Sequence, residues 1–84
     1  MIDARTIDLY AAHPESVPPE LASRPMRDRR GRRLAVGDEV TIDGVRLRIV
    51  GRDGGWIDLV DSRGEPDVRF VTELREEAVR VAKK

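Results

Sequence analysis

Hydrophobic and polar residues alternate along the second half of the chain, with the period of two that is typical of β-strands. The alternation recurs in five short stretches from position 39 onward, and glycine, aspartate, serine or proline separates them. Asp43-Gly44 is the strongest signal for a tight hairpin. The pattern predicts a small five-stranded antiparallel β-barrel over about residues 36–82. Its predicted strands cover residues 39–43, 45–49, 56–61, 67–72 and 78–82.

The positions that alternate toward the inside of these strands predict the hydrophobic core. A polar turn at residues 73–77, long enough for one helical turn, adds Leu74 to this predicted core. The predicted core residues are Val40, Ile42, Val45, Leu47, Ile49, Ile57, Leu59, Val68, Phe70, Leu74, Val79 and Val81. A core of this size is marginal for a single domain, and closure into a barrel would leave few free strand edges.

The first 33 residues lack this alternation. Residues 1–13 predict a short helix that Asp3 can cap and that ends before Pro14. This helix could add Ile2, Leu9 and Tyr10 to one open end of the barrel, or present them to a partner. Residues 14–33 contain four prolines and then six arginines, which predicts an extended Pro- and Arg-rich arm. Residues 34–84 form the predicted barrel domain.

The barrel segment opens on Leu34-Ala35-Val36-Gly37-Asp38-Glu39-Val40, and a tight hairpin, three short strands, a helical turn and a last short strand follow. This order resembles the SH3-like small β-barrels, and among them the KOW-type prokaryotic barrels. It is similar in style to small barrel proteins of high-GC actinobacteria and their phages, including those at phage head-to-tail junctions. The resemblance covers residues 34–82 and implies binding of protein or nucleic acid rather than catalysis.

The charge of the chain is unevenly distributed although its net value is zero. Residues 1–23 carry four acids and one arginine, a net of −3. Residues 24–33 carry six arginines and one aspartate, a net of +5, and residues 34–84 carry eleven acids and nine bases, a net of −2. One concentrated basic segment therefore precedes a nearly neutral body.

The basic segment is the first candidate site. Its arginines could neutralise several phosphates of a nucleic acid, with affinity that depends on salt. They could equally be solvated or pair with acids elsewhere in the chain, in surface ion pairs that contribute about 0–1 kcal/mol each. The candidate arm residues are Arg27, Arg29, Arg30, Arg32 and Arg33.

The outward face of the barrel is the second candidate site. Alternation places Arg46, Arg48, Trp56 and Arg69 there, a composition enriched at protein-binding hot spots and able to stack a base. The alternative, which we favour, is that Trp56 lies under the N-terminal helix and closes the barrel. A chain with so few aromatic residues rarely leaves its single tryptophan uncovered.

Residues suited to catalysis or metal binding are scarce. The chain has no cysteine and one histidine, so no zinc-ligand spacing exists, and its glycines form no phosphate-binding loop. No catalytic residue, cofactor, metal or small-molecule substrate is expected.

The sequence thus predicts a non-enzymatic interaction module. The first hypothesis is docking on a protein partner or self-association, for instance as a phage assembly, adaptor or host-interaction protein. The alternative is a nucleic-acid-binding barrel that binds the phosphate backbone with its Arg-rich arm.

We expect no membrane association, because no apolar run is long enough to span a bilayer. The expected location is the cytoplasm of a bacterial host, or the virion if the protein is a phage structural protein.

Overall fold

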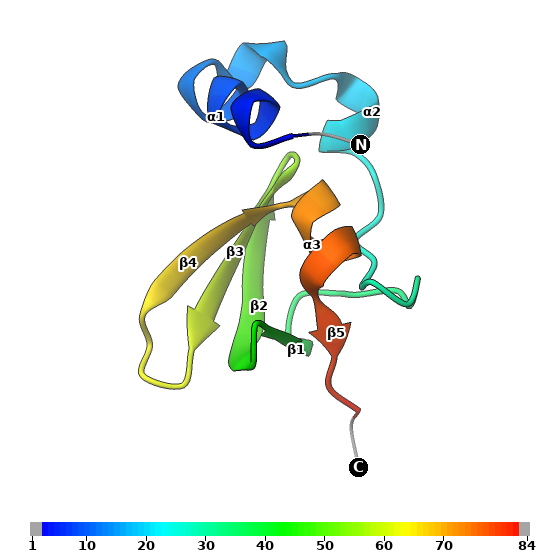
Figure 1. Cartoon of the computed structure of the whole chain (residues 1–84), viewed down its shortest axis with the longest axis vertical. Coiled ribbons are helices and arrows are strands. Elements are labelled where there is room, and N and C mark those ends of the chain that lie inside the picture. Colours follow the sequence, from blue (N-terminus) through cyan, green and yellow to red (C-terminus); the bar gives the residue numbers. More distant parts are fainter. Residues whose placement is uncertain (1–2, 83–84) are drawn as a thin grey trace.

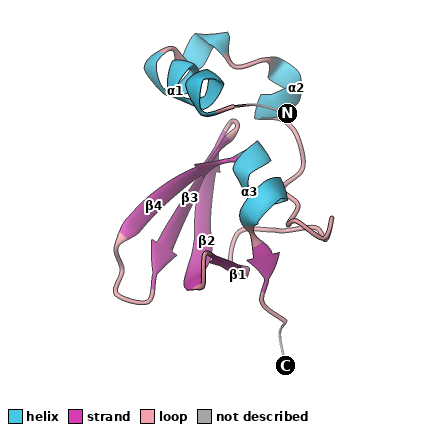
Figure 2. Ribbon diagram, viewed as in Figure 1, coloured by secondary structure: helices cyan, strands magenta, loops and turns pink. Residues whose placement is uncertain are grey.

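The computed structural model describes residues 3–82 and places three short helical segments before a β-sheet (Figure 1). The helical segments cluster above the end of the sheet formed by the β2–β3 hairpin, and one further helix lies between the last two strands (Figure 2). In chain order the elements are α1 (Ala4–Ala12), η1 (Pro14–Ser16), α2 (Pro19–Ala22), β1 (Glu39–Ile42), β2 (Val45–Asp53), β3 (Trp56–Asp61), β4 (Pro66–Phe70), α3 (Val71–Glu77) and β5 (Val79–Arg80).

The sheet has five antiparallel strands, as the alternation predicts, in the order β4-β3-β2-β1-β5. The prediction of a closed barrel is wrong, because β4 and β5 are the two edges of the sheet and do not pair with each other in the described part of the chain. β5 is only two residues long, and other parts of the chain occupy its free edge, as described below. The sheet is therefore open, with five strands and four pairings.

The predicted hairpin turn at Asp43-Gly44 is confirmed. Both residues have positive φ angles, 51° and 77°, as a type I′ turn requires. Ile42 pairs directly with Val45 across this turn. The turn thus sets the register that keeps Val40 and Leu47 on the buried side.

The N-terminal helix begins as predicted. The Asp3 carboxylate accepts hydrogen bonds from the backbone N–H and the hydroxyl of Thr6, each at 2.9 Å. Its contribution to the core differs from the prediction: Leu9 is exposed, and Ile2 lies outside the described residues. Tyr10 packs against Phe70, with ring centroids 5.3 Å apart, so α1 covers the sheet through its aromatic residue.

The segment predicted as an extended arm is folded instead. Prolines stand in the first turns of η1 and α2, where a missing N–H removes no helical hydrogen bond. Leu21 and Met26 of this segment, and Leu34 directly after it, are buried in the core and link the segment to the sheet. The alternation signal could not identify these three residues because they do not lie in strands.

The core otherwise follows the prediction over β1, β2 and β3. Two predicted core residues, Val45 and Val68, are about half exposed, and Val79 and Val81 are only partly buried. Val71 and Ala78 are buried although neither was predicted. The eight predicted residues that are buried are Val40, Ile42, Leu47, Ile49, Ile57, Leu59, Phe70 and Leu74.

The register of β4 reverses the faces expected for this strand. Phe70 pairs with Trp56, and Arg69 pairs with Ile57. Directly paired residues of antiparallel strands share a face of the sheet. Arg69 therefore lies on the face of Ile57, and the prediction that it shares an outward face with Trp56 is wrong. Phe70 is buried on the opposite face because Tyr10 and Trp56 pack against it.

The strand also ends two residues earlier than predicted, and α3 begins at Val71. The Glu73 carboxylate accepts a hydrogen bond of 3.0 Å from the backbone N–H of Phe70, which stabilises the start of this helix. A second carboxylate, that of Asp67, accepts from the N–H of Val68 at 2.8 Å. Pro66, the first residue of β4, has no backbone N–H group that could donate to another strand. The outer edge of β4 is thus closed to pairing with another strand.

Gly55 allows the aromatic cluster around Phe70 to form. A Cβ atom at this position would lie 2.7 Å from Cε1 and 2.9 Å from Cζ of Phe70, too close for any real contact. We predict that Gly55→Ala destabilises the protein by about 2 kcal/mol, the usual effect of overpacking a filled core. Urea denaturation of both proteins measures the difference.

Gly51→Ala is the matched control. Gly51 lies in β2, and a Cβ atom added there would have Oδ2 of Asp58 as its nearest neighbour, at an ordinary contact distance of 3.6 Å. We expect this variant to stay within about 0.5 kcal/mol of the wild type. Equal effects of the two substitutions would contradict the role assigned to Gly55.

Candidate functional site

The basic segment forms a short hairpin, called here the basic hairpin and defined as residues 27–33. Arg27 and Arg33 form a β-bridge at its open end, and Gly31, with a φ of 81°, makes its turn. The backbone N–H of Asp28 donates to the carbonyl of Arg32 at 3.0 Å, and that of Gly31 donates to the carbonyl of Asp28 at 2.9 Å. The arginines therefore project from an ordered turn.

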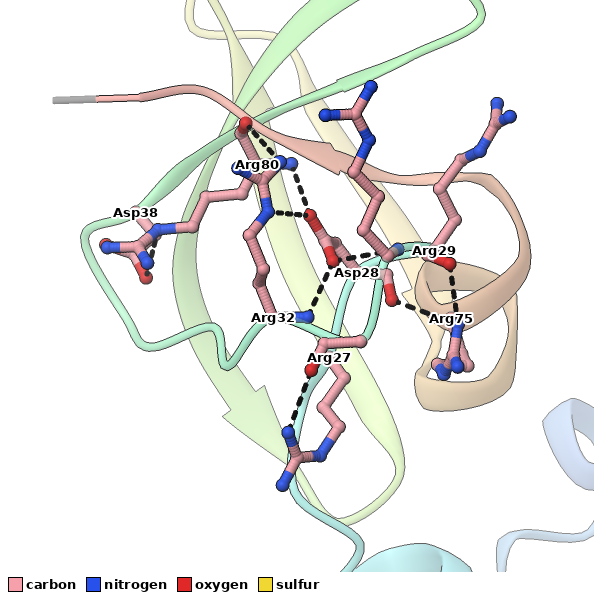
Figure 3. A network of polar contacts seen from close by, with 9 residues as sticks. Arg27, Asp28, Arg29, Arg32, Asp38, Arg75 and Arg80 are labelled. Carbon is pink, nitrogen blue, oxygen red and sulfur yellow. Dashed lines mark hydrogen bonds and ion pairs between the residues drawn. The ribbon is translucent and has the colours of Figure 1, made fainter.

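The side chain of Asp28 is completely buried at the centre of this hairpin (Figure 3). Its Oδ1 accepts hydrogen bonds from the backbone N–H groups of Arg30 (3.0 Å) and Arg32 (2.8 Å). Its Oδ2 accepts from Nε of Arg32 (3.0 Å) and from the backbone N–H of Arg80 in β5 (2.9 Å). Four donors thus surround the single acid of a segment with six arginines.

These contacts determine the protonation of Asp28. Burial raises the pKa of the carboxyl, but the hydrogen bonds from the N–H of Arg80 and from the N–H groups of Arg32 outweigh it. The pKa of Asp28 therefore lies below its ordinary value of 3.8. The carboxylate is ionised at neutral pH and compensates one arginine of the hairpin.

The basic hairpin also covers the free edge of β5. The N–H of Arg29 donates to the carbonyl of Ala78 at 2.8 Å, and the guanidinium of Arg32 donates to the carbonyl of Arg80 at 3.0 Å. From α3, Arg75 donates to the carbonyls of Asp28 and Arg29, at 3.3 and 2.7 Å (Figure 3). The hairpin is thereby fixed to the last strand and the last helix.

The five predicted arm arginines differ in the partners of their side chains. Arg32 pairs with Asp28 and is an internal structural residue. Arg27 donates to the carbonyl of Gly31 at 2.8 Å but has no carboxylate within 4 Å among the described residues. The side chains of the other three make no hydrogen bond or ion pair with any described residue, and all are exposed: these are Arg29, Arg30 and Arg33.

The four residues predicted for the outward face do not form one surface. Arg46 and Arg48 both pair with the Glu39 carboxylate, beside a shallow cavity of about 240 Å³. Trp56 is partly buried and packs edge-on against Phe70, with centroids 5.0 Å apart. Arg69, on the opposite face, pairs with Asp67.

Two further arginines lie beside the basic hairpin. Arg24 and Arg75 line a cleft between α2, the hairpin and α3 together with Arg27. Arg24 belongs to the basic segment but is not among the predicted arm residues, and Arg75 was expected in a polar turn. Only the packing of α3 against the hairpin brings these positions together, so no local signal could have identified them.

Comparison with known proteins finds no significant match to any family model, curated protein or solved structure. Within residues 3–82, no helix is both long enough and apolar enough to cross a membrane. The same part of the chain contains no group of three or more His, Asp or Glu residues able to hold a metal ion. The basic hairpin, with four exposed arginines that have no carboxylate within 4 Å among the described residues, is the candidate site that geometry and charge support best.

The buried carboxylate of Asp28 provides a test of this arrangement. We predict that Asp28→Asn lowers the free energy of unfolding at pH 7 by about 3 kcal/mol, because the Arg32 guanidinium loses its buried counter-charge. Since the pKa of Asp28 is lowered in the folded protein, its contribution is complete above pH 3.8 and is lost as the pH falls from there through the folded pKa. The difference between wild type and variant should therefore shrink below about pH 4. Urea denaturation as a function of pH measures it.

Asp58→Asn, which removes an equal charge from an exposed strand position, is the control. We expect little change in stability from this substitution at any pH. A difference between Asp28→Asn and wild type that stays constant down to pH 2 would contradict the proposed role of the ionised carboxylate.

Proposed function

We propose that the protein is a non-enzymatic interaction module that binds nucleic acid through the phosphate backbone, using the basic hairpin. The observation that carries this proposal is the set of arginines without an acidic partner in the described part of the chain. Arg29, Arg30 and Arg33 project from the hairpin, Arg27 lies at its base, and Arg24 precedes it. Of the six arginines in residues 24–33, only Arg32 pairs with a carboxylate of the described residues.

Phosphate suits this surface for two reasons. The planar guanidinium group offers two parallel donors to phosphate oxygens, and each phosphate it neutralises releases counterions. The hairpin is already ordered by Asp28 and by its contacts with β5, so binding does not have to order a flexible arm. These features favour nucleic-acid binding over docking on a protein.

Docking on a protein partner has less support. It was motivated by an outward Trp56, and this side chain packs on Phe70 instead. Addition of a partner strand to the sheet is also disfavoured, because carboxylates close the edge of β4 and the basic hairpin covers β5. The remaining support for docking on a protein is a set of half-exposed valines, such as Val45, Val50 and Val68. Size-exclusion chromatography with light scattering tests self-association, and a strict monomer would count against that form of docking.

The SH3-like resemblance is part of this proposal. Two features of the sheet support it: the last strand, β5, returns to pair with the first, β1, and a short helix, α3, precedes β5. Small β domains of this kind serve as binding modules, so the resemblance is consistent with an interaction role, while the choice of partner rests on the arginines.

Binding of labelled duplex DNA and single-stranded RNA, followed by fluorescence anisotropy over a series of salt concentrations, tests the proposal. We predict that the wild type binds at low salt and that affinity falls as salt rises. In the triple variant Arg29→Ala, Arg30→Ala, Arg33→Ala, the slope of log affinity against log salt should decrease by about one for each arginine that contacts a phosphate.

A second triple variant, Arg46→Ala, Arg48→Ala, Arg63→Ala, removes the same charge from the sheet and a turn. We expect it to retain most of the affinity of the wild type. Thermal unfolding of both variants verifies that they fold. The proposal fails if the wild type binds neither nucleic acid at low salt, or if the two triple variants lose affinity equally.

A further inference from the structure

Next to the basic hairpin, three arginines line one narrow cleft, two of them from the basic segment and one from α3. Arg24 follows α2, Arg27 lies at the base of the hairpin, and Arg75 is on α3. The cleft has a volume of about 190 Å³ and contains no acidic residue among those that line it. A single phosphate group is the kind of ligand that three guanidinium groups around a small space can bind.

Two of these guanidinium groups are already held in place. Nη1 of Arg27 donates to the carbonyl of Gly31, and Nη1 of Arg75 donates to the carbonyls of Asp28 and Arg29 (Figure 3). Each guanidinium has five N–H donors, so most of them stay available for an anion. None of the three arginines has a carboxylate within 4 Å in the described part of the chain.

A wider cavity of about 440 Å³ adjoins this cleft and shares Arg24 and Arg75 with it. Tyr10 and Leu21 provide apolar walls, and Thr72 lies on the side of α3. The Thr72 hydroxyl is buried and has no hydrogen-bond partner among the described residues. A buried polar atom without a partner is uncommon in folded proteins, and here it belongs to a residue that lines the cavity.

The two parts of this space differ in charge. Glu20 and Glu76 line the wider cavity, which disfavours a second phosphate there but offers acceptors for hydroxyl or amino groups. The aromatic ring of Tyr10, packed on Phe70, offers a surface for a planar group. A nucleotide unit has this distribution of chemistry, with one anionic end and one planar, hydrogen-bonding end.

We propose that this combined space holds one nucleotide unit of a single strand, with its phosphate among Arg24, Arg27 and Arg75 and its nucleoside toward Tyr10 and Thr72. The inference rests on the proposed function and makes it more specific. A base can enter a cavity only when it is unstacked, so the preferred nucleic acid is single-stranded rather than a duplex.

Titration of the ¹⁵N-labelled full chain, followed by NMR, tests this inference with adenosine 5′-monophosphate, adenosine and inorganic phosphate as probes. We expect the monophosphate to give saturable shifts at the amides of Arg24, Thr72 and Arg75. Adenosine and inorganic phosphate should bind at least tenfold more weakly, because each lacks one half of the ligand. Equal affinity for inorganic phosphate would overturn the assignment of the nucleoside, and an absence of shifts at these amides would overturn the site.

Two variants separate the parts of the site. Arg24→Ala should weaken binding of the monophosphate about tenfold, the equivalent of one charge-assisted hydrogen bond. Thr72→Val should also weaken it, while the melting temperature stays the same or rises because an unpaired buried hydroxyl is removed. Arg30→Ala, which removes the same charge from the hairpin turn, is the control and should leave monophosphate affinity within twofold.

Competition with oligonucleotides distinguishes this inference from the proposed function. A single strand should displace the bound monophosphate, and a duplex of the same sequence should not. If strands bind through Arg29, Arg30 and Arg33 but Arg24→Ala and Thr72→Val change nothing, the nucleotide site is refuted and the proposed function stands. If no strand of either kind binds at low salt, the proposed function is refuted.

Discussion

The carboxylate of Asp28 joins two parts of the chain, the basic hairpin and β5, that lie 52 residues apart in sequence. It closes the turn of the basic hairpin through the N–H groups of Arg30 and Arg32, and it binds the N–H of Arg80 in the last strand. Removing a charge from water is unfavourable unless enough donors replace the water, and here four donors do so. This carboxylate therefore strengthens both the turn of the hairpin and its contact with the sheet, beside the backbone hydrogen bonds that each already has.

The arrangement of the arginines follows from this constraint. One guanidinium, that of Arg32, is used to compensate the buried charge, and the others remain at the surface. The hairpin also occupies the edge of β5, while Asp67 and Glu73 occupy the N–H groups along β4. An open sheet of five strands is thus protected against pairing with other chains, which a closed barrel would achieve by having no edges. The side chains of the basic hairpin that have no acidic partner among the described residues are cationic.

Local pattern was a good guide where the structure depends on neighbouring residues. The type I′ turn at Asp43-Gly44, the cap at Asp3 and the buried positions of β1, β2 and β3 could all be predicted, because short-range geometry decides them. The face of the sheet on which Phe70 lies could not be predicted in this way. In β4 alternation alone does not say which side is covered, and Tyr10, sixty residues earlier in the chain, decides it. The burial of Leu21 and Met26 escaped prediction because the prolines and arginines around them indicated an extended arm, and that of Leu34 because it lies outside the strands.

The sequence by itself determined the strands, their turns and the concentration of positive charge in residues 24–33. Only the tertiary structure decided which of those charges are available. Asp28 and Arg80 are 52 residues apart, and a contact over that distance depends on how the whole sheet folds and not on local preference. The same packing brings Arg75 beside Arg24 and Arg27. The protein therefore has an ordered cationic surface although its net charge is zero, because the acids that balance these arginines lie elsewhere on the molecule.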